Sequence, residues 1–497
     1  MVASFIRKVP TASGARAVQI VHKRGRVVVG IEHIGSAHDD ARLAVLTEVA
    51  RQRLHAGQDE LDFGLAAPAG GARIVGMASQ VLWDVLTGAY SRLGFDVVAD
   101  DAFQAMVLAR MIEPTSKADT IRVLGEIGVG CPGLRTLFRA LGRCQERDYR
   151  DRLARACMGF SARTSGTAAM VLYDVTTLHF ENDEEDDLRR VGMSKEHRVD
   201  PQVQVGLLVD PAGFPLEVHL FEGNKAETTT LIPVLTAFQA RHGITDMVVV
   251  ADAGMLSAGN LIAIEDAGFS FIVGSRIVKA PYDLADHFER HGDYFTDGQI
   301  LESSRVMGTG KGARPRRVVY QYSFKRHKRD DRNINLMITK AERVAAGQAS
   351  MRKVRFLKVT GAVKVLDQAT IERARQLAGL KGYVTNLPAE KMTGEQVIAA
   401  YHDLWQVEAS FRMTKHDLKA RPVFHHQRDA IEAHLTVVFA ALAISRHLQA
   451  LTGVTIKRLV RTLRPLHTVT IDIAGHQITA KTPPSPETTE LLQQITG

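Results

Sequence analysis

Two aspartates stand in matching settings along the chain. Asp174 ends the apolar run 170–173, and Asp252 ends the apolar run 247–251. A charged residue at the end of a buried strand leaves the core while the strand still holds it in place. Carboxylate oxygens in such a place suit Mg²⁺ or Mn²⁺. Because Asp also begins many turns, the matching pair is a stronger signal than either residue alone.

A third carboxylate, Glu408, lies in a segment whose spacing predicts a helix over 401–415. One stripe of this helix is polar or aromatic and carries Tyr401, Trp405, Glu408, Arg412 and Lys415. The adjacent stripe is apolar and carries Ala400, Leu404, Val407, Phe411 and Leu418. We therefore expect a helix that packs along one side and holds Glu408 between aromatic rings and cations. An exposed Glu408–Arg412 ion pair of little energetic consequence is the simpler alternative.

The three carboxylates together would make an oxygen-rich site for two divalent ions. Two ions about 4 Å apart can activate a water or a 3′-hydroxyl and stabilise the leaving oxygen of a phosphoryl transfer. Lys415 suits a phosphate as a point charge. Tyr401 or Trp405 could stack on a displaced base, although a place in the core is the stronger expectation for Trp405.

These segments resemble the DDE transposases of bacterial insertion sequences, in the subgroup with a β-rich insertion between the second aspartate and the glutamate. The resemblance rests on Leu-Tyr-Asp174-Val-Thr-Thr-Leu, on Val-Val-Ala-Asp252-Ala-Gly-Met, and on the order Tyr401, Glu408, Lys415. It covers about residues 170–450. The family pattern has an arginine where this chain has Leu404, so the contact of that arginine is in question and Arg412 is a nearby cation.

The resemblance implies a ribonuclease H-like catalytic core in which Asp174, Asp252 and Glu408 are the ligands of two Mg²⁺ or Mn²⁺ ions. It implies hydrolysis at the transposon end, followed by attack of the freed 3′-hydroxyl on target DNA. It also places Tyr401 and Lys415 near the cleaved DNA.

Other cations near these motifs are candidates for phosphate contacts. Lys195 and Arg198 follow the acidic run 182–187, and Arg421 belongs to a further family-like segment, 421–425. With Tyr401, Arg412 and Lys415, they complete the predicted DNA-binding residues.

The elements expected to position these residues alternate between strands and helices. Strands are predicted at 170–174, 203–210, 214–221, 247–252 and 269–273, and helices at 227–242 and 257–267. This order predicts an α/β fold, a mixed sheet with flanking helices, which the resemblance identifies as ribonuclease H-like.

The chain divides into five predicted regions. An N-terminal β-meander and several helices occupy 1–165 as a DNA-binding or dimerisation region. The catalytic core is split into 166–276 and 391–452 by a basic, β-rich insertion at 277–390, and a C-terminal tail follows at 453–497. The basic helices of 99–145 permit a helix-turn-helix with 133–142 as recognition helix; a dimerisation bundle and a solvated basic face are the alternatives.

Composition sets the outer bounds. The 497 residues carry a net charge of +8 and have a pI of about 9.3, which is compatible with a nucleic-acid partner. Three well-separated cysteines indicate a reducing cytoplasm, and residues 1–10 lack the apolar region expected of a signal peptide. The apolar run 435–444 is too short for a bilayer and predicts a buried helix, with no membrane partner. No GxxxxGK[ST] motif is present, so no nucleotide cofactor is expected.

Three histidines, His425, His426 and His434, lie close together in the sequence. Because no cysteine stands near them, packing or a phosphate contact is a stronger expectation than zinc.

We therefore expect a cytoplasmic, nucleoid-associated DDE transposase. It would act on double-stranded DNA, at transposon ends and at a target, as a homodimer when two ends are synapsed. A ribonuclease H-like nuclease without strand transfer and a non-catalytic DNA-binding protein from a decayed element are the alternatives.

Overall fold

The protein is described from a computed structural model. The structure describes residues 2–11, 14–55, 73–166, 170–181, 184–192, 200–226, 229–244, 246–255, 257–275, 277–308, 310–350, 354–360, 363–473 and 476–496. They form a mixed α/β fold in two compact units. Unit 1 comprises Met1–Leu153, His416–Lys419 and His425–Gly497, and unit 2 comprises Ala154–Lys415 and Ala420–Phe424.

Unit 1 begins with the predicted β-meander. Strands β1 (Val2–Pro10), β2 (Arg16–Arg24) and β3 (Val27–Ala37) pair antiparallel, and helix α1 (Asp40–His55) packs on them through apolar side chains that include Val18, Ile20 and Leu43. The next helices confirm the prediction: α2 (Gln80–Arg92), α3 (Asp101–Ile112), α4 (Thr120–Glu126), α5 (Leu134–Glu146) and α6 (Tyr149–Ser165), whose last residues belong to unit 2.

Helix α15 (Arg428–Thr452) forms the centre of unit 1 and contacts α2, α3, α5, α16 (Ile456–Leu463) and α17 (Pro486–Thr496). Among the described helices it alone is long and apolar enough to cross a membrane by length and composition, but 72% of its apolar window is buried in the protein. The predicted buried helix at 435–444 is thus confirmed. The predicted C-terminal tail contains a hairpin of β15 (Thr468–Ile473) and β16 (His476–Lys481), with β4 (Arg73–Ala78) as a third strand.

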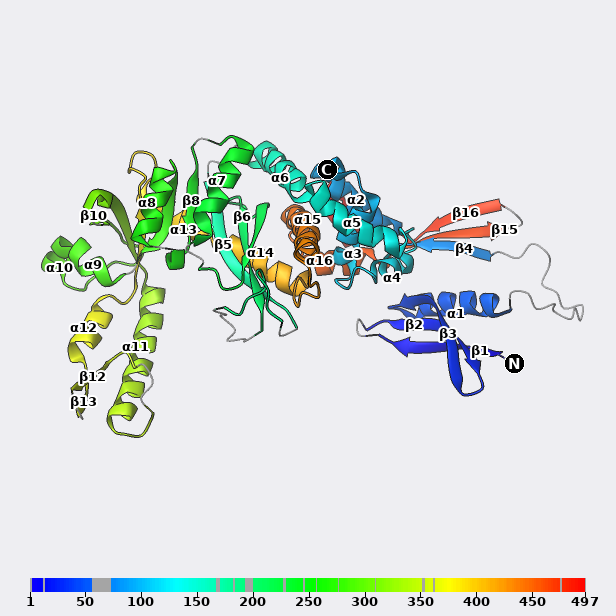
Figure 1. The fold of residues 1–497 in the computed structure, drawn as a ribbon, viewed down its shortest axis with the longest axis horizontal. Helices are drawn as coiled ribbons and strands as arrows, with labels where there is room; N and C mark the ends of the chain where they lie inside the picture. The colour runs from blue at the N-terminus through cyan, green and yellow to red at the C-terminus, as the bar shows by residue number, and fades with distance from the viewer. Residues whose placement is uncertain are drawn as a thin grey trace, which may run out of the picture. The chain divides into compact units, whose positions relative to one another are not determined.

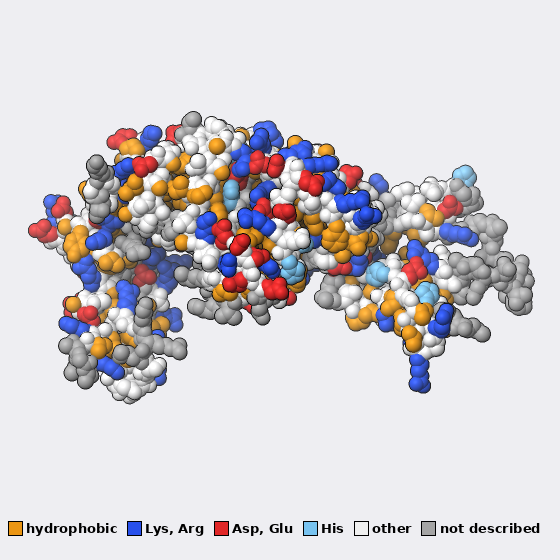
Figure 2. All heavy atoms as spheres, in the orientation of Figure 1, with side chains coloured by type: hydrophobic (Ala, Val, Ile, Leu, Met, Phe, Trp, Pro, Cys, Tyr) orange, Lys and Arg blue, Asp and Glu red, His pale blue; other side chains and the backbone are white. Residues whose placement is uncertain are grey.

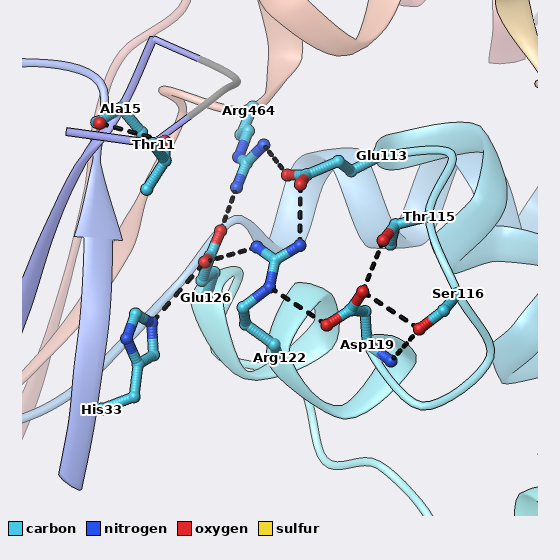
Figure 3. A network of polar contacts seen from close by, with 10 residues as sticks. All are labelled: Thr11, Ala15, His33, Glu113, Thr115, Ser116, Asp119, Arg122, Glu126 and Arg464. Atoms are coloured by element: carbon cyan, nitrogen blue, oxygen red, sulfur yellow. Dashed lines mark hydrogen bonds and ion pairs between the residues drawn. The ribbon is translucent and has the colours of Figure 1, made fainter. Parts of the chain in front are cut away.

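A network of ion pairs joins the meander to the helices of unit 1 (Figure 3). The Glu126 carboxylate, which is buried, accepts hydrogen bonds from Arg122 at 2.8 Å and Arg464 at 2.7 Å, and lies 3.7 Å from the His33 ring. Burial alone would raise the pKa of Glu126, but the hydrogen bonds and charges of these partners lower it to about 2.

Replacing Glu126 with Gln is therefore expected to destabilise the protein by about 2 kcal/mol at pH 7, after allowance for the solvent-exposed part of Arg122. The folded pKa lies below the unfolded one, so this stabilisation is present above pH 4.5 and is lost as the pH falls towards 2. Urea unfolding at pH 7 and pH 4 tests this expectation. A difference between wild type and Glu126→Gln that did not shrink at the lower pH would contradict it.

Unit 2 contains an eight-stranded mixed sheet in the order β10-β11-β14-β9-β8-β5-β6-β7 (Figure 1). Its first part along the chain consists of β5 (Met170–His179), β6 (Gln202–Val209), β7 (Pro215–Glu222), β8 (Val248–Ala251) and β9 (Ser270–Ser275). Helices α7 (Leu231–His242) and α8 (Ala258–Asp266) connect the later strands. Strand β8 is parallel to both β5 and β9, and the other neighbours are antiparallel. The predicted strands, hairpin and helices of this region are confirmed.

Residues 277–390 add strands to the sheet and also form a separate group of helices and strands outside it. After α9 (Ala280–Asp283) and α10 (Ala285–His291), the strands β10 (Ile300–Met307), β11 (Arg314–Tyr322) and β14 (Leu380–Thr385) extend the sheet beyond β9. Between β11 and β14, helix α11 (Phe324–Ala345), the hairpin β12 (Leu357–Thr360) and β13 (Val363–Leu366), and helix α12 (Gln368–Gln376) share an apolar core. Figure 1 shows these elements projecting from the sheet as a lobe. The basic stretch 325–329 lies in the first turns of α11.

Helices α13 (Gly394–His402) and α14 (Trp405–Arg412) follow β14. Helix α13 contacts β8, β9 and β14, and α14 contacts β5 and β6. Side chains alternate between the faces of a strand, and Tyr173 of β5 donates its hydroxyl to Thr230, just before α7. The neighbouring residue, Asp174, therefore faces the opposite side of the sheet, which α13 and α14 cover.

Candidate catalytic site

Asp174 and Asp252 occupy corresponding positions on neighbouring parallel strands. Leu172 pairs with Val250 and Tyr173 with Ala251, so the next residues in register are the two aspartates. Strands lie about 4.8 Å apart in a sheet, which places both carboxylates on the same edge of the α13–α14 face. Asp174 is half-buried and Asp252 is exposed.

One part of the strand-end prediction is wrong. Asp252 does follow β8 directly, but β5 continues beyond Asp174 to His179. The reason is that β6 pairs with β5 along this whole extension, whereas β8 ends at Ala251. Asp174 thus lies where the parallel pairing ends, and its strand is held further by the antiparallel partner.

Tyr401 fixes the side chain of Asp252. Its hydroxyl donates to Asp252 Oδ1 at 2.8 Å, and the backbone N–H of Ala253 donates to the same oxygen at 2.7 Å. Burial raises the pKa of Tyr401, and the Asp252 carboxylate raises it further, so the phenol stays protonated and donates. Asp252 is therefore held by two donors before any substrate is bound.

Gly274 of β9 leaves the space through which Tyr401 reaches Asp252. A Cβ at this position would lie 2.7 Å from the Tyr401 hydroxyl oxygen and 3.0 Å from the Cβ of Ala253. Both are closer than ordinary contacts, so the tyrosine would have to move. The absence of a side chain at residue 274 is what permits the hydrogen bond.

Gly274→Ala is expected to slow DNA-end cleavage about tenfold, because loss of one hydrogen bond to a charged acceptor corresponds to about 1.4 kcal/mol. Tyr401→Phe should give a similar loss. Gly259→Ala is a matched control, because its Cβ would meet only the Ser257 hydroxyl, at 4.0 Å. The test is to measure the single-turnover cleavage rate of each variant. Equal rates for Gly274→Ala and Gly259→Ala would show that the Tyr401 contact has no effect on the reaction.

The segment 401–415 is not the single helix that the spacing predicts. Helix α13 ends at His402, α14 begins at Trp405, and a π-helical turn, η6 (Met413–Asp417), follows. The hydrogen bonds from Leu404 to Tyr401 and from Val407 to Leu404 each span three residues, so the backbone tightens at the junction and shifts the phase of the stripe.

This shift reverses the expected positions of the two aromatic side chains. Trp405, expected in the core, is 55% exposed, whereas Tyr401 is only 6% exposed. Val407, Phe411 and Leu418 of the apolar stripe are buried as predicted. In this structure Trp405, not Tyr401, offers an exposed ring.

Glu408 lies in the first turn of α14 and is exposed. Among the described ion pairs none joins it to Arg412, so the simpler prediction of a surface pair between them is wrong. Asp252 and Glu408 both raise the pKa of Lys381 on β14. Both carboxylates are thus near enough for their charges to act on the Lys381 amine, which lies over the Tyr401 ring.

The donor set suits a hard divalent cation, because all three groups offer carboxylate oxygens. Within the described residues, however, no three Asp, Glu, His or Cys side chains are close enough together to hold one ion. Like charges repel at short range, so the three carboxylates would need the positive charge of a cation to converge.

The predicted DNA-binding residues fall into three groups. Arg412 is exposed on α14, while Lys415 and Arg421 are half-buried. Tyr401 is buried and occupied with Asp252. Lys195 and Arg198 lie outside the described residues.

The basic helices of unit 1 differ from the expected solvated face. Arg110 is buried and donates to the backbone carbonyls of Leu418 and Lys419 at 2.8 and 3.2 Å, and Arg122 belongs to the Glu126 network. Of the basic residues in 99–145, only Arg135 and Arg139, both on α5, are exposed; the others are Arg110, Lys117, Arg122 and Arg143. The helix-turn-helix stays a prediction, in which Arg135 and Arg139 could contact DNA.

Two histidines near the start of α15, His425 and His434, lie against Lys117. Lys117 Nζ lies 2.5 Å from Nε2 of His425 and 2.7 Å from Nδ1 of His434. The three cysteines are free, and Cys144 and Cys157 are buried, in agreement with the predicted absence of disulfides.

Sequence reasoning missed Lys381, Arg326 and Gly274. Lys381 and Arg326 belonged to stretches predicted only as basic surface or strand. The position of Lys381 over Tyr401 depends on pairing between β9 and β14, which are over a hundred residues apart. The Gly-Tyr in β14 and the isolated Gly in β9 were the available signals, since a glycine inside a strand often marks a close approach.

Comparison with known proteins gives a family match and similar solved structures. Residues 167–444 match the family described as "Transposase DDE domain", and the match includes Asp174, Asp252 and Glu408. The cryo-EM structure of a piggyBac transposase synaptic complex with hairpin DNA is similar at 8% sequence identity and a TM-score of 0.38, over 78% of this chain and 79% of that chain. A search of curated proteins gave no match. Because the family match spans more than half of the chain, the protein belongs to the transposase DDE domain family.

Proposed function

We propose that this protein cuts double-stranded DNA at the ends of its own element and joins the freed 3′-hydroxyl to target DNA, in a reaction that depends on Mg²⁺ or Mn²⁺. The observation that carries the proposal is the register of β5 and β8, which sets Asp174 beside Asp252, with Glu408 on the helix that covers the same face. We infer that β5 to β9 form the ribonuclease H-like core.

In this proposal Asp174, Asp252 and Glu408 would hold two ions. When bound, such ions lower the pKa of the attacking water or hydroxyl and neutralise charge on the phosphate. Tyr401 and the Ala253 N–H hold one Asp252 oxygen, and no described residue is seen to donate to the other. Arg412 and Lys415 offer positive charge on the same helical segment for the DNA backbone.

The family match supports a DNA partner, and the two ends of an element must be brought together for transposition. We propose a homodimer on DNA, because closed twofold assemblies are the commonest way to present two equivalent sites. Regions 1–165 and 453–497 would then serve DNA-end recognition and dimerisation. The free cysteines fit a reducing cytoplasm, which in bacteria contains the nucleoid.

A strand-transfer assay tests the proposal. Duplexes that carry the element ends, already cut to expose the 3′-hydroxyl, are incubated with the protein, supercoiled plasmid and Mg²⁺. We expect plasmid joined to the duplex ends. Cleavage of uncut ends without joining would identify a nuclease, and binding without either reaction would identify a non-catalytic DNA-binding protein.

A further inference from the structure

Lys381 lies over two aromatic rings beside the candidate site. Its Nζ is 4.3 Å from the ring centroid of Tyr401 and 5.4 Å from that of Tyr383. Attraction between an ammonium group and the ring faces helps to hold the charge at this point. Because Tyr401 donates to Asp252, only one side chain separates Lys381 from a proposed catalytic carboxylate.

The charge of Lys381 is not neutralised locally. Among the described ion pairs of unit 2, none includes Lys381. Burial lowers its pKa, the charges of Arg326 and Arg329 lower it further, and the charges of Asp252 and Glu408 raise it. The charges of two guanidinium groups and of two candidate catalytic carboxylates therefore act on this one amine.

Arg326 and Arg329 lie one turn apart on α11 and share a single carboxylate. Asp330 is 3.4 Å from Arg326 Nε and 3.8 Å from Arg329 Nε, and it also accepts the backbone N–H of Gly379 at 3.2 Å. The Arg326 Nε is buried and makes no hydrogen bond within the described residues. Two guanidinium groups thus share one carboxylate, and one guanidinium N–H has no hydrogen-bond acceptor among the described residues.

Figure 2 shows Lys and Arg side chains gathered near the end of α11 that meets the sheet. A surplus of positive charge beside a polar site favours an anion. An ammonium and two guanidinium groups match phosphate oxygens, and the guanidinium groups can also donate in pairs.

We propose that Lys381, Arg326 and Arg329 bind a backbone phosphate of the DNA strand that is cut at Asp174 and Asp252. This inference rests on the proposed function and names residues of the sheet and of the α11 lobe that position the strand. It also gives the lobe a purpose: α11 carries its basic first turns to the edge of the catalytic face.

Binding of duplex DNA without divalent cations tests the proposal independently of cleavage. Affinity is measured over a range of salt concentrations for wild type, Lys381→Gln, Lys381→Arg and Lys340→Gln, with a duplex that carries the element end. Lys340 is a matched control, because it is exposed on the same helix as Arg326, about 20 Å away at 1.5 Å per residue.

Loss of one phosphate contact lowers the slope of log K against log salt by about 1. We expect this decrease in slope for Lys381→Gln. Lys340→Gln and Lys381→Arg should both keep the wild-type slope. A single methylphosphonate at the contacted phosphate should weaken wild type but not weaken Lys381→Gln further.

A Lys381→Gln slope equal to that of wild type, in protein that unfolds at the wild-type urea concentration, would overturn the proposal and leave Lys381 as a support for Tyr401. Failure of the proposed function has a different signature: the slopes would follow the expectation, but wild type would neither cut nor join DNA when Mg²⁺ is added.

Discussion

Asp252→Asn is expected to reduce Mg²⁺-dependent cleavage of element-end DNA at least about a thousandfold, which corresponds to about 4 kcal/mol of lost transition-state stabilisation. The amide keeps the size of the side chain and can still accept the Tyr401 hydroxyl. The fold and the affinity for DNA should therefore persist, and what is lost is the negative charge of one oxygen ligand. Single-turnover cleavage at saturating DNA measures the effect.

Asp286→Asn is the matched control for this prediction. Asp286 is exposed on α10 in the same unit, and its substitution removes the same charge away from the candidate site. We expect wild-type cleavage for this variant. Undiminished cleavage by Asp252→Asn would remove Asp252 from the site and, through the β5–β8 register, weaken the assignment of Asp174.

Lys117→Met is expected to stabilise unit 1 at neutral pH and to flatten the pH dependence of its stability. Burial, with a further contribution from Arg110, lowers the pKa of Lys117 from 10.5 to about 6. Between these values the unfolded chain carries a proton on Lys117 that the folded protein lacks. Stability therefore rises with pH across this window, by about 1.4 kcal/mol per pH unit.

The size of the effect at pH 7 follows from two opposing contributions. At pH 7, folding with a neutral Lys117 lowers the free energy of unfolding by about 5 kcal/mol relative to pH 10.5. The side chain is partly exposed, which reduces this value. Removing the amine leaves His425 and His434 without their shared partner, at a cost of about 1–3 kcal/mol. A net stabilisation of about 2 kcal/mol is expected.

Urea unfolding from pH 6.5 to 9 checks this prediction, with Lys481→Met, exposed on β16, as control. The advantage of Lys117→Met over wild type should shrink as the pH rises, while Lys481→Met should follow wild type. Parallel curves for wild type and Lys117→Met would mean that Lys117 titrates as an ordinary surface lysine.

The sequence predicted strands β5 to β9 well because each of them has a local residue pattern that is typical of a strand. The runs before Asp174 and Asp252 are apolar, which is typical of strands buried on both faces. The hairpin of β6 and β7 is marked by its Pro-Ala-Gly turn. The aspartates could be singled out because they interrupt that apolar pattern.

Features that depend on distant partners could not be predicted. Strand β4 is short, contains Gly76, and pairs with β15, nearly four hundred residues further along the chain. The position of Lys381 over Tyr401 similarly needs the sheet to bring β14 beside β9. Local patterns carry no information on such pairings.

The break between α13 and α14 escaped prediction for another reason. The spacing of the polar stripe is compatible with a continuous helix, and no Pro or Gly interrupts it. The break is visible only in the hydrogen bonds of Leu404 and Val407, and it decides which aromatic side chain is buried.

The central claim is that Asp174, Asp252 and Glu408 bind the same divalent ions. The most direct test counts Mn²⁺ bound per subunit by electron paramagnetic resonance, with protein on its element-end duplex and the duplex alone as blank. The account predicts two ions for wild type and fewer for each of Asp174→Asn, Asp252→Asn and Glu408→Gln. Two ions retained by all three variants would contradict it.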